Sequence, residues 1–178
     1  MQFLPETYFD LHKFPFADIF KDITNIWDVL PRIKQYAGGT LIMGKNCSIH
    51  PNANIREGVI LGDNVHIGYS VELKNCMVMS NTAVAHLNYI GDGVIGNDVN
   101  VAGGAILANL RLDKKPVRIK SDNKIIDTHL EKFSCIIGDH SSLGANCVLN
   151  PGTILGKNSV VYPLTSVQGV YPNSSIVR

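Results

Sequence analysis

The chain has 178 residues, a formal net charge of +1 and a hydrophobic content of 45%. These values suit one soluble domain with an appendage, and the small net charge argues against binding nucleic acid or an anionic membrane surface. No apolar run is long enough to span a bilayer and the N-terminus lacks a signal-peptide pattern, so we expect a cytoplasmic protein.

The first 38 residues differ from the rest of the chain. Met1–Phe16 contains two prolines and scattered aromatic residues, which is typical of an extended arm. Between Phe16 and Tyr36 apolar residues recur every three or four positions, which predicts one amphipathic helix or two short ones, with Pro31 limiting continuity. We expect residues 1–38 to cap the first coil of the domain that follows, residues 39–178; a role in binding a specific partner is the alternative.

From Met43 onwards, a large aliphatic residue or methionine recurs every six residues, with glycine, asparagine and aspartate in the intervals. A fixed period of this kind indicates a solenoid, in which each unit contributes one short strand and one turn. Three units close a coil of about eighteen residues, so we predict an all-β, three-sided parallel β-helix. A flat all-β domain with chance spacing explains the pattern poorly. The two runs, in which Ala85 is the one smaller residue, are Met43, Ile49, Ile55, Leu61, Ile67, Leu73, Met79 and Ala85, then Ile137, Leu143, Leu149, Leu155, Val161 and Val167.

The period slips from six to five between Ala85 and Ile90 and again between Ile90 and Ile95. We expect the slip to distort one corner of the coil directly after His86. Irregularity in a regular scaffold is often where function lies.

Residues 108–134 interrupt the repeat with a long basic insertion. A long insertion in a repeat protein is often functional, so we predict an arm that clamps an anion; a solvated surface excursion is the alternative. The repeat resumes at Cys135, and we expect Gln168–Arg178 to cover the last coil. The basic residues are Arg111, Lys114, Lys115, Arg118, Lys120, Lys124 and Lys132.

The four cysteines include no CxxC pair, so neither a zinc site nor a disulfide framework is expected. Cys47 and Cys147 occupy small-residue positions of the repeat, which favours core packing.

His86 opens a polar, glycine-rich run. A histidine titrates near neutrality and suits a general base, which acyl transfer to an amine requires. Turn amides near Gly103 suit an oxyanion site for the tetrahedral intermediate. A solvated histidine in a turn is the alternative.

Two segments carry a resemblance to a known family: HLNYIGDGVIGNDVN from His86, and NLRLDKK from Asn109 to Lys115. They resemble the hexapeptide-repeat acyltransferases and, more narrowly, the acetyltransferase domain of the two-domain enzymes that make UDP-N-acetylglucosamine; the loop is most similar to the archaeal-type branch. The resemblance implies a left-handed β-helix, a homotrimer with active sites between subunits, and acetyl-CoA as co-substrate. It implies N-acetylation of an amino-sugar phosphate, with glucosamine 1-phosphate first. Residues 1–38 are too few for the nucleotidyltransferase domain that usually precedes, which suggests a separate nucleotidyltransferase as a partner.

Carried over residue by residue, the resemblance makes His86 the general base and involves no metal. It assigns the phosphate to Arg56, Lys74 and Lys115, the sugar to Tyr89, Asn100 and Asn109, and acetyl-CoA to Gly103, Ala145 and Pro163. Three departures from the family pattern bear on which sugar is used. The family's IGAG turn is Val101-Ala102-Gly103-Gly104, Leu110 replaces a tyrosine of bacterial relatives, and Arg118 stands near a second lysine of the archaeal-type loop.

Three other functions compete with this one. The first is a scaffold or regulatory module that kept the coil and lost turnover. The second is a zinc enzyme of the γ-carbonic-anhydrase type, which would use His50, His66 and His86 between subunits but lacks that family's local motif. The third is an acyltransferase for another nucleotide-linked amino sugar.

Overall fold

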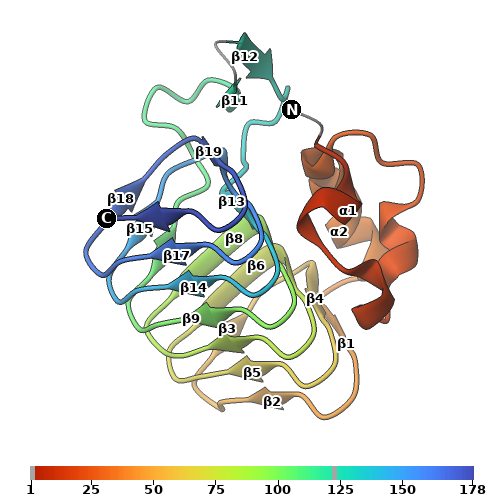
Figure 1. The fold of residues 1–178 in the computed structure, drawn as a ribbon. Helices are drawn as coiled ribbons and strands as arrows, with labels where there is room; N and C mark the ends of the chain where they lie inside the picture. Colours follow the sequence, from red (N-terminus) through yellow and green to blue (C-terminus); the bar gives the residue numbers. More distant parts are fainter. Residues whose placement is uncertain (1–2, 122–123) are drawn as a thin grey trace.

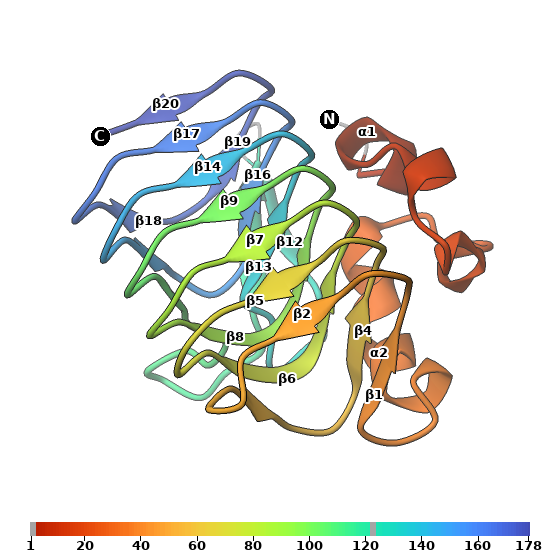
Figure 2. The ribbon, with the colours of Figure 1, turned by 90° about the horizontal axis from the view of Figure 1, so that it is seen from below.

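The computed structural model describes residues 3–121 and 124–178. Its body is a parallel β-helix in which each coil stacks on the previous one through backbone hydrogen bonds (Figures 1 and 2). The predicted left-handed β-helix is therefore confirmed. In the part of the chain that is described, the longest helix has seven residues, and none is long and apolar enough to cross a membrane.

The coil has three faces, each a ladder of parallel strands. The first face contains β1 (Leu41–Met43), β4 (Val59–Leu61), the second halves of β6 (Glu72–Val78) and β8 (Tyr89–Ile95), β13 (Cys135–Ile137), β16 (Thr153–Leu155) and β19 (Val170–Tyr171). The second face contains β2 (Ser48–Ile49), β5 (His66–Ile67), β7 (Ala83–Val84), β9 (Asn100–Val101), β14 (Ser142–Leu143), β17 (Val160–Val161) and β20 (Ile176–Val177). The third face contains β3 (Asn54–Ile55), the first halves of β6 and β8, β10 (Ile106–Leu107), β15 (Val148–Leu149) and β18 (Ser166–Val167).

Three corners join the faces, and in most coils a corner has one residue in the left-handed region of backbone space. We call the turn from the first to the second face the first corner, and the next two turns the second and third corners. In the early coils the first corner holds Asn46, Asn64, Asn81 and Asp98, with φ between 56° and 60°. Short polar side chains tolerate this conformation, because they can hydrogen-bond locally.

One of the two predicted slips in the period is confirmed, and the other was misplaced. The residues that face the axis after Leu73 are Val78 and Val84, both fully buried, and not Met79 and Ala85. The two five-residue steps are therefore Leu73–Val78 and Ile90–Ile95, both at the third corner. There β6 and β8 continue as seven-residue strands from the third face onto the first. The second corner, which carries His86, keeps the regular spacing.

The N-terminal segment folds into short helical turns: α1 (Pro5–Tyr8), the 3₁₀ turns Leu11–Lys13, Ala17–Phe20 and Ile26–Val29, and α2 (Leu30–Tyr36). The predicted amphipathic helix is thus broken into short pieces. The expected position over the end of the first coil is wrong, because the segment lies along the side of the first face (Figures 1 and 2).

The aromatic and aliphatic residues of this segment form a second core outside the coil. They cover the outward ladder of the first face, which consists of Ile60, Met77, Val94, Ile136 and Ile154. Met79 is buried in the same core, which explains why an apolar residue stands at this position although it does not face the axis of the coil.

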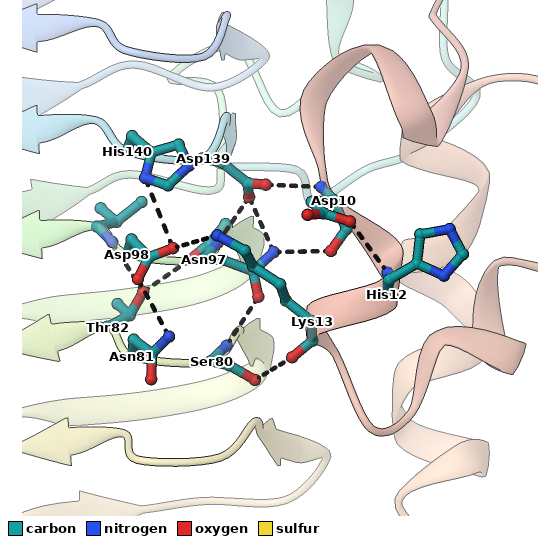
Figure 3. A network of polar contacts seen from close by, with 12 residues as sticks. Asp10, His12, Lys13, Ser80, Asn81, Thr82, Asn97, Asp98, Asp139 and His140 are labelled. Atoms are coloured by element: carbon teal, nitrogen blue, oxygen red, sulfur yellow. Dashed lines mark hydrogen bonds and ion pairs between the residues drawn. The ribbon is translucent and has the colours of Figure 1, made fainter.

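A polar network fastens the N-terminal segment to the first corner (Figure 3). Asp139, which is 1% exposed, accepts hydrogen bonds from the Asp10 amide at 2.6 Å and the Asn97 amide at 2.7 Å. Ser80 donates to the Lys13 carbonyl at 2.7 Å. The network satisfies backbone groups that the docked segment would otherwise bury unpaired.

The insertion leaves at the third corner after β10 and returns at β13. It forms the hairpin β11 (Arg118–Ser121) and β12 (Lys124–Asp127). Val117 and Ile119 pack, fully buried, into the core outside the first face. The C-terminal residues do not fold over the last coil as expected. They extend the helix, with β19 and β20 on the first and second faces.

All four cysteines are free thiols, and three are buried. Burial raises the pKa of the Cys76 thiol to about 12 and that of Cys147 to about 11. These thiols therefore stay protonated at neutral pH and act as apolar core residues.

Replacement of Asp139 by alanine should detach the N-terminal segment from the first corner. Two backbone donors would lose a charged acceptor in a buried site. Hydrogen bonds to charged groups contribute about 1.5–3 kcal/mol each, so we expect Asp139→Ala to lower the free energy of unfolding in urea by about 3 kcal/mol. The variant should also expose the N-terminal segment to limited proteolysis.

Lys13→Ala is the matched control, because it removes an exposed ion pair from the same network. The Lys13 ammonium lies 3.1 Å from the Asp98 carboxylate at the rim. Its effect on stability should be much smaller. Equal stability losses in the two variants would contradict the fastening role of Asp139.

Candidate active site

Four of the predicted site residues form one column along the second corner. The amide of Gly104 donates to the His86 carbonyl at 2.9 Å, that of Asn146 to Gly103 at 3.0 Å, and that of Leu164 to Ala145 at 2.9 Å. His86, Gly103, Ala145 and Pro163 therefore occupy the same turn position in four successive coils. They are the predicted base and the three predicted acetyl-CoA contacts.

The imidazole of His86 lies against the backbone of Gly103. A Cβ atom at position 103 would come within 2.9 Å of the His86 Cδ2 and 3.1 Å of its Nε2. The next residue, Gly104, has φ of +75°, and a Cβ there would overlap the Asn146 side-chain oxygen. Because Gly103 and Gly104 of the altered Ala102-Gly103-Gly104 turn have no side chains, the exposed His86 ring packs directly against the backbone of this turn.

The buried side chain of Asn88 supports this turn, a role that was not predicted from the sequence. The side chain is 3% exposed, and its Nδ2 donates to the Ala102 carbonyl at 2.7 Å and the Ala105 carbonyl at 3.4 Å. Asn88 occupies the small-residue position of the repeat, where Ala105 and Cys147 stand in later coils. A polar residue at that position is the signal in the sequence.

A second cluster lies at the third corner around Asp92, which is 5% exposed. Its carboxylate accepts from the Asn75 Nδ2 at 2.9 Å and the Asn109 Nδ2 at 2.5 Å, and the Lys74 Nζ lies 3.5 Å away. Asn109 also donates to the Tyr89 hydroxyl at 3.1 Å. Three predicted acceptor-binding residues are thus brought together by a carboxylate that the sequence analysis did not single out.

Tyr89 connects the two corners. It lies on the outward side of the third face, between the second corner with His86 and the third corner with Asn109. Burial, together with the nearby Asp92 and Glu72 carboxylates, raises the pKa of the Tyr89 phenol. The phenol therefore stays neutral and able to donate a hydrogen bond. The candidate site is a strip across the third face from His86 to Lys74.

The other predicted phosphate ligands lie at the edges of this strip. The Arg56 guanidinium pairs with the Glu72 carboxylate at 2.9 Å, and both side chains are partly exposed. Lys115 is exposed in the insertion, where its amide donates to Asp113 at 3.3 Å. The Arg111 guanidinium pairs with Asp113 at 2.6 Å and holds the pKa of that carboxyl well below its usual range. No hydrogen bond or ion pair joins Lys115 to the Asp92 cluster within the described residues.

Asn100 lies on another side of the coil from the acceptor cluster. It projects from the second face and lines a shallow hollow of about 410 Å³ together with Ala145 and Pro163. Within one chain, Asn100 is thus grouped with predicted acetyl-CoA residues and not with Tyr89 and Asn109.

The basic insertion lines a hollow of about 660 Å³. Arg118 and Lys120 line one side, and the turns at Gly152 and Gly169 line the other. Because Val117 and Ile119 are buried, the alternate residues Arg118 and Lys120 are turned outward.

The remaining histidines are separate from this strip. His66 lies on the second face with its Nδ1 2.8 Å from the Ser48 Oγ, and His50 packs edge-on against Tyr69. Among the described residues, no three His, Cys, Asp or Glu side chains gather in a metal-binding arrangement.

Comparison with known families identifies the chain. Residues 37–130 match the family described as the GMPPB C-terminal domain, and residues 135–162 match the hexapeptide repeat of succinyl-transferase. Because the first match spans more than half of the chain, the protein belongs to the hexapeptide-repeat family of the GMPPB C-terminal domain.

Two of the relatives are longer proteins that are named as bifunctional. The chain is 38% identical over 113 residues to a bifunctional sugar-1-phosphate nucleotidylyltransferase/acetyltransferase of Sulfurisphaera tokodaii, covering 64% of this chain and 28% of that protein. It is 34% identical over 186 residues to the bifunctional protein GlmU of Methanococcus maripaludis, covering 85% of this chain and 45% of that protein. The chain thus spans less than half the length of either relative.

Among solved structures, the chain is similar to AntD, an N-acyltransferase from Bacillus cereus in complex with dTDP and 3-hydroxybutyryl-CoA. The TM-score is 0.60 at 17% identity, and the match covers 80% of this chain and 79% of AntD. At this identity the likeness concerns the β-helix fold.

Replacement of Gly103 by alanine should displace the His86 ring without unfolding the coil. Ala145 holds the same turn position one coil later, so the backbone there accepts a Cβ, and the cost to stability should stay below about 1 kcal/mol. We expect the imidazole proton resonances of His86, assigned by their loss in His86→Ala, to shift clearly in Gly103→Ala.

Ala145→Gly makes the opposite exchange in the same column and should leave those resonances in place. Unshifted His86 resonances in Gly103→Ala would show that the ring does not rest on this turn.

Proposed function

We propose that the protein is an acetyl-CoA-dependent N-acetyltransferase for an amino-sugar phosphate, with glucosamine 1-phosphate as the first acceptor to test. The observation that best supports this proposal is the column at the second corner, in which His86 packs against Gly103, in line with Ala145 and Pro163. This column lies beside the polar strip of the third face. The relatives named as acetyltransferases support the reaction class, and the CoA complex of AntD supports the co-substrate.

In this proposal, the His86 imidazole takes a proton from the acceptor's amine as its nitrogen attacks the thioester carbonyl. A carbon–nitrogen bond forms, the carbon–sulfur bond then breaks, and the leaving thiolate takes the proton from the His86 imidazolium, so that CoA is released as its thiol. The backbone amide of Gly103 suits the oxyanion that develops between the two steps, because the neighbouring Gly104 amide already donates to the His86 carbonyl. The exposed ring of His86 is accessible to an acceptor, and Gly103 leaves space beside it.

The charges at the third corner suggest how the acceptor's phosphate is held. Lys74 faces Asp92, and Arg56 faces Glu72, so each of these cations already has a carboxylate partner. The acceptor's phosphate would therefore draw on the insertion, where Lys114 and Lys115 are exposed. We assign Lys115 to the phosphate in agreement with the family pattern.

A homotrimer belongs to the same proposal. Leu87 and Leu164 are 60% and 80% exposed and hold φ near 60°, a conformation that costs a branched residue roughly 1–2 kcal/mol. Serine, glycine and asparagine occupy this position in neighbouring coils. Bulky apolar residues at strained, exposed turns favour contact with another subunit. Further exposed apolar residues beside this corner are Tyr69, Ile106, Val148, Val160 and Tyr162.

The trimer can be tested at Leu164. Wild-type protein should scatter light with three times the chain mass of 19.4 kDa. Leu164→Asn should weaken assembly while keeping the chain folded, because asparagine suits the left-handed turn. Leu112→Asn is the control, since Leu112 is fully exposed in the insertion. A monomeric wild type at working concentration would count against the trimer.

The base role is tested by His86→Ala. We expect kcat for N-acetylation of glucosamine 1-phosphate to fall by about 10²–10⁴, the usual contribution of a positioned base, with little change in melting temperature. Raising the pH should partly rescue the variant, because more of the amine then arrives neutral. The measurement is release of CoA thiol together with detection of the acetylated sugar.

His66→Ala is the matched control, since it removes another exposed imidazole from the second face. Its kcat should equal that of the wild type. Full activity of His86→Ala at neutral pH would assign the base elsewhere, and CoA binding without transfer in the wild type would favour a scaffold.

A further inference from the structure

The third corner carries a ladder of three polar side chains from successive coils. Asn75, Asp92 and Asn109 are 17 residues apart, and both amides donate to the central carboxylate. The middle position is well buried, and Lys74 approaches the same carboxylate at 3.5 Å.

A second ladder at the first corner shows that such stacking does not need a central charge. There Asn46 donates to Asn64 at 3.3 Å, and Asn64 donates to Asn81 at 2.9 Å. Asn81 in turn donates to Asp98 at 3.1 Å, so the carboxylate stands at the end of this ladder and not in its middle. Neutral amides therefore stack head to tail between coils of this protein. An aspartate inside the third-corner ladder calls for a further reason.

That reason lies in the direction of the hydrogen bonds. An ionised carboxylate only accepts, so both neighbouring amides must turn their NH₂ groups toward Asp92. One N–H of Asn109 is used by Asp92 and the other by the Tyr89 hydroxyl oxygen at 3.1 Å. Asn109 therefore keeps its Oδ1 as an acceptor for a ligand, and Tyr89 keeps its O–H as a donor.

We propose that Asp92 is a positioning residue that fixes this polarity, so that Tyr89 donates to and Asn109 accepts from one hydroxyl of the acceptor sugar. The proposal rests on the proposed function, because the strip must bind an amino-sugar phosphate. A donor and an acceptor held side by side match a hydroxyl group, which both accepts and donates. Lys74 balances the charge of the carboxylate without taking part in the contact.

The neutral residue asparagine at position 92 would remove this control. It suits the left-handed backbone, since Asp92 has φ of 52° and Asn75 holds the equivalent position in the previous coil. Its own NH₂ group would let the Asn109 amide turn over, and the donor and acceptor would then exchange places. The corner should remain folded while its selectivity for a hydroxyl is lost.

The test measures binding by calorimetry, which needs no turnover. Wild-type protein is titrated with glucosamine 1-phosphate and with analogues in which one ring hydroxyl is replaced by hydrogen or fluorine. We expect one ring position at which the wild type prefers the hydroxyl about tenfold, the equivalent of about 1.4 kcal/mol. In Asp92→Asn that preference should fall to about twofold.

Tyr89→Phe supplies the coupling measurement. In the wild-type background, Tyr89→Phe should remove much of the preference for the hydroxyl. In the Asp92→Asn background it should reduce the preference little further, because both changes act on one hydrogen-bond pair. Asp98→Asn is the matched control, with the same exchange at a left-handed turn of the same coil but at the first corner. It should leave the preference unchanged.

The outcomes separate the two proposals. Equal weakening of the parent sugar and every analogue by Asp92→Asn would mean a purely structural role and overturn the inference, as would a wild type that binds no amino-sugar phosphate. Selective binding with no acetyl transfer would overturn the proposed function and leave the inference standing.

Discussion

The hydrogen-bond register between coils is the constraint on which the rest of this structure depends. Each strand pairs in parallel with its counterpart in the next coil, so outside the insertion a residue lies beside the one that follows 16 to 18 positions later. Residues that act together are therefore those that share a column. His86 meets Gly103, and Asp92 meets both Asn75 and Asn109, through this register alone. The insertion at 108–134 leaves it intact, because β8 pairs with β10 and β13 on either side of the interruption.

The three corners carry different residues at the left-handed backbone position. Those of the first corner stabilise the fold, whereas the second and third corners border the candidate site. The first corner uses asparagine, aspartate, histidine and serine. Its asparagines join neighbouring coils, and Asp98 also binds Lys13 of the N-terminal segment. The second corner accepts strained leucines at Leu87 and Leu164, which support neither the core nor a ladder. The third corner combines shortened steps with the exit of the insertion. The second corner, with its leucines, and the third corner, with its shortened steps, flank the third face, where the candidate site lies.

The sequence predicted the fold well, because one aliphatic residue per six is a local signal. It misplaced one slip at Met79 and Ala85, since in each case two apolar residues are adjacent and counting cannot tell which faces the axis. Met79 is buried by the N-terminal segment, a contact between distant parts of the chain. The same limit applies to the site. The resemblance pointed to His86, Tyr89 and Asn109, whereas Asp92 and Asn88 gain their roles from partners 14 to 17 residues away on other coils.

The way the three faces are covered links the fold to its proposed activity. The outward ladder of the first face is apolar from Ile60 to Ile154, and leaving it in water would cost about 25 cal/mol per Å². The N-terminal segment covers it from one side, and Val117, Ile119 and Phe133 of the insertion cover it from the other. The outward columns of the second and third faces mix polar and small residues, such as Ser48, Asn100 and Glu72, with exposed apolar ones, such as Ile106 and Val160. The appendages thus cover the apolar first face, and they leave open the two faces that meet at His86, where the exposed apolar residues suit contact with another subunit in the proposed trimer.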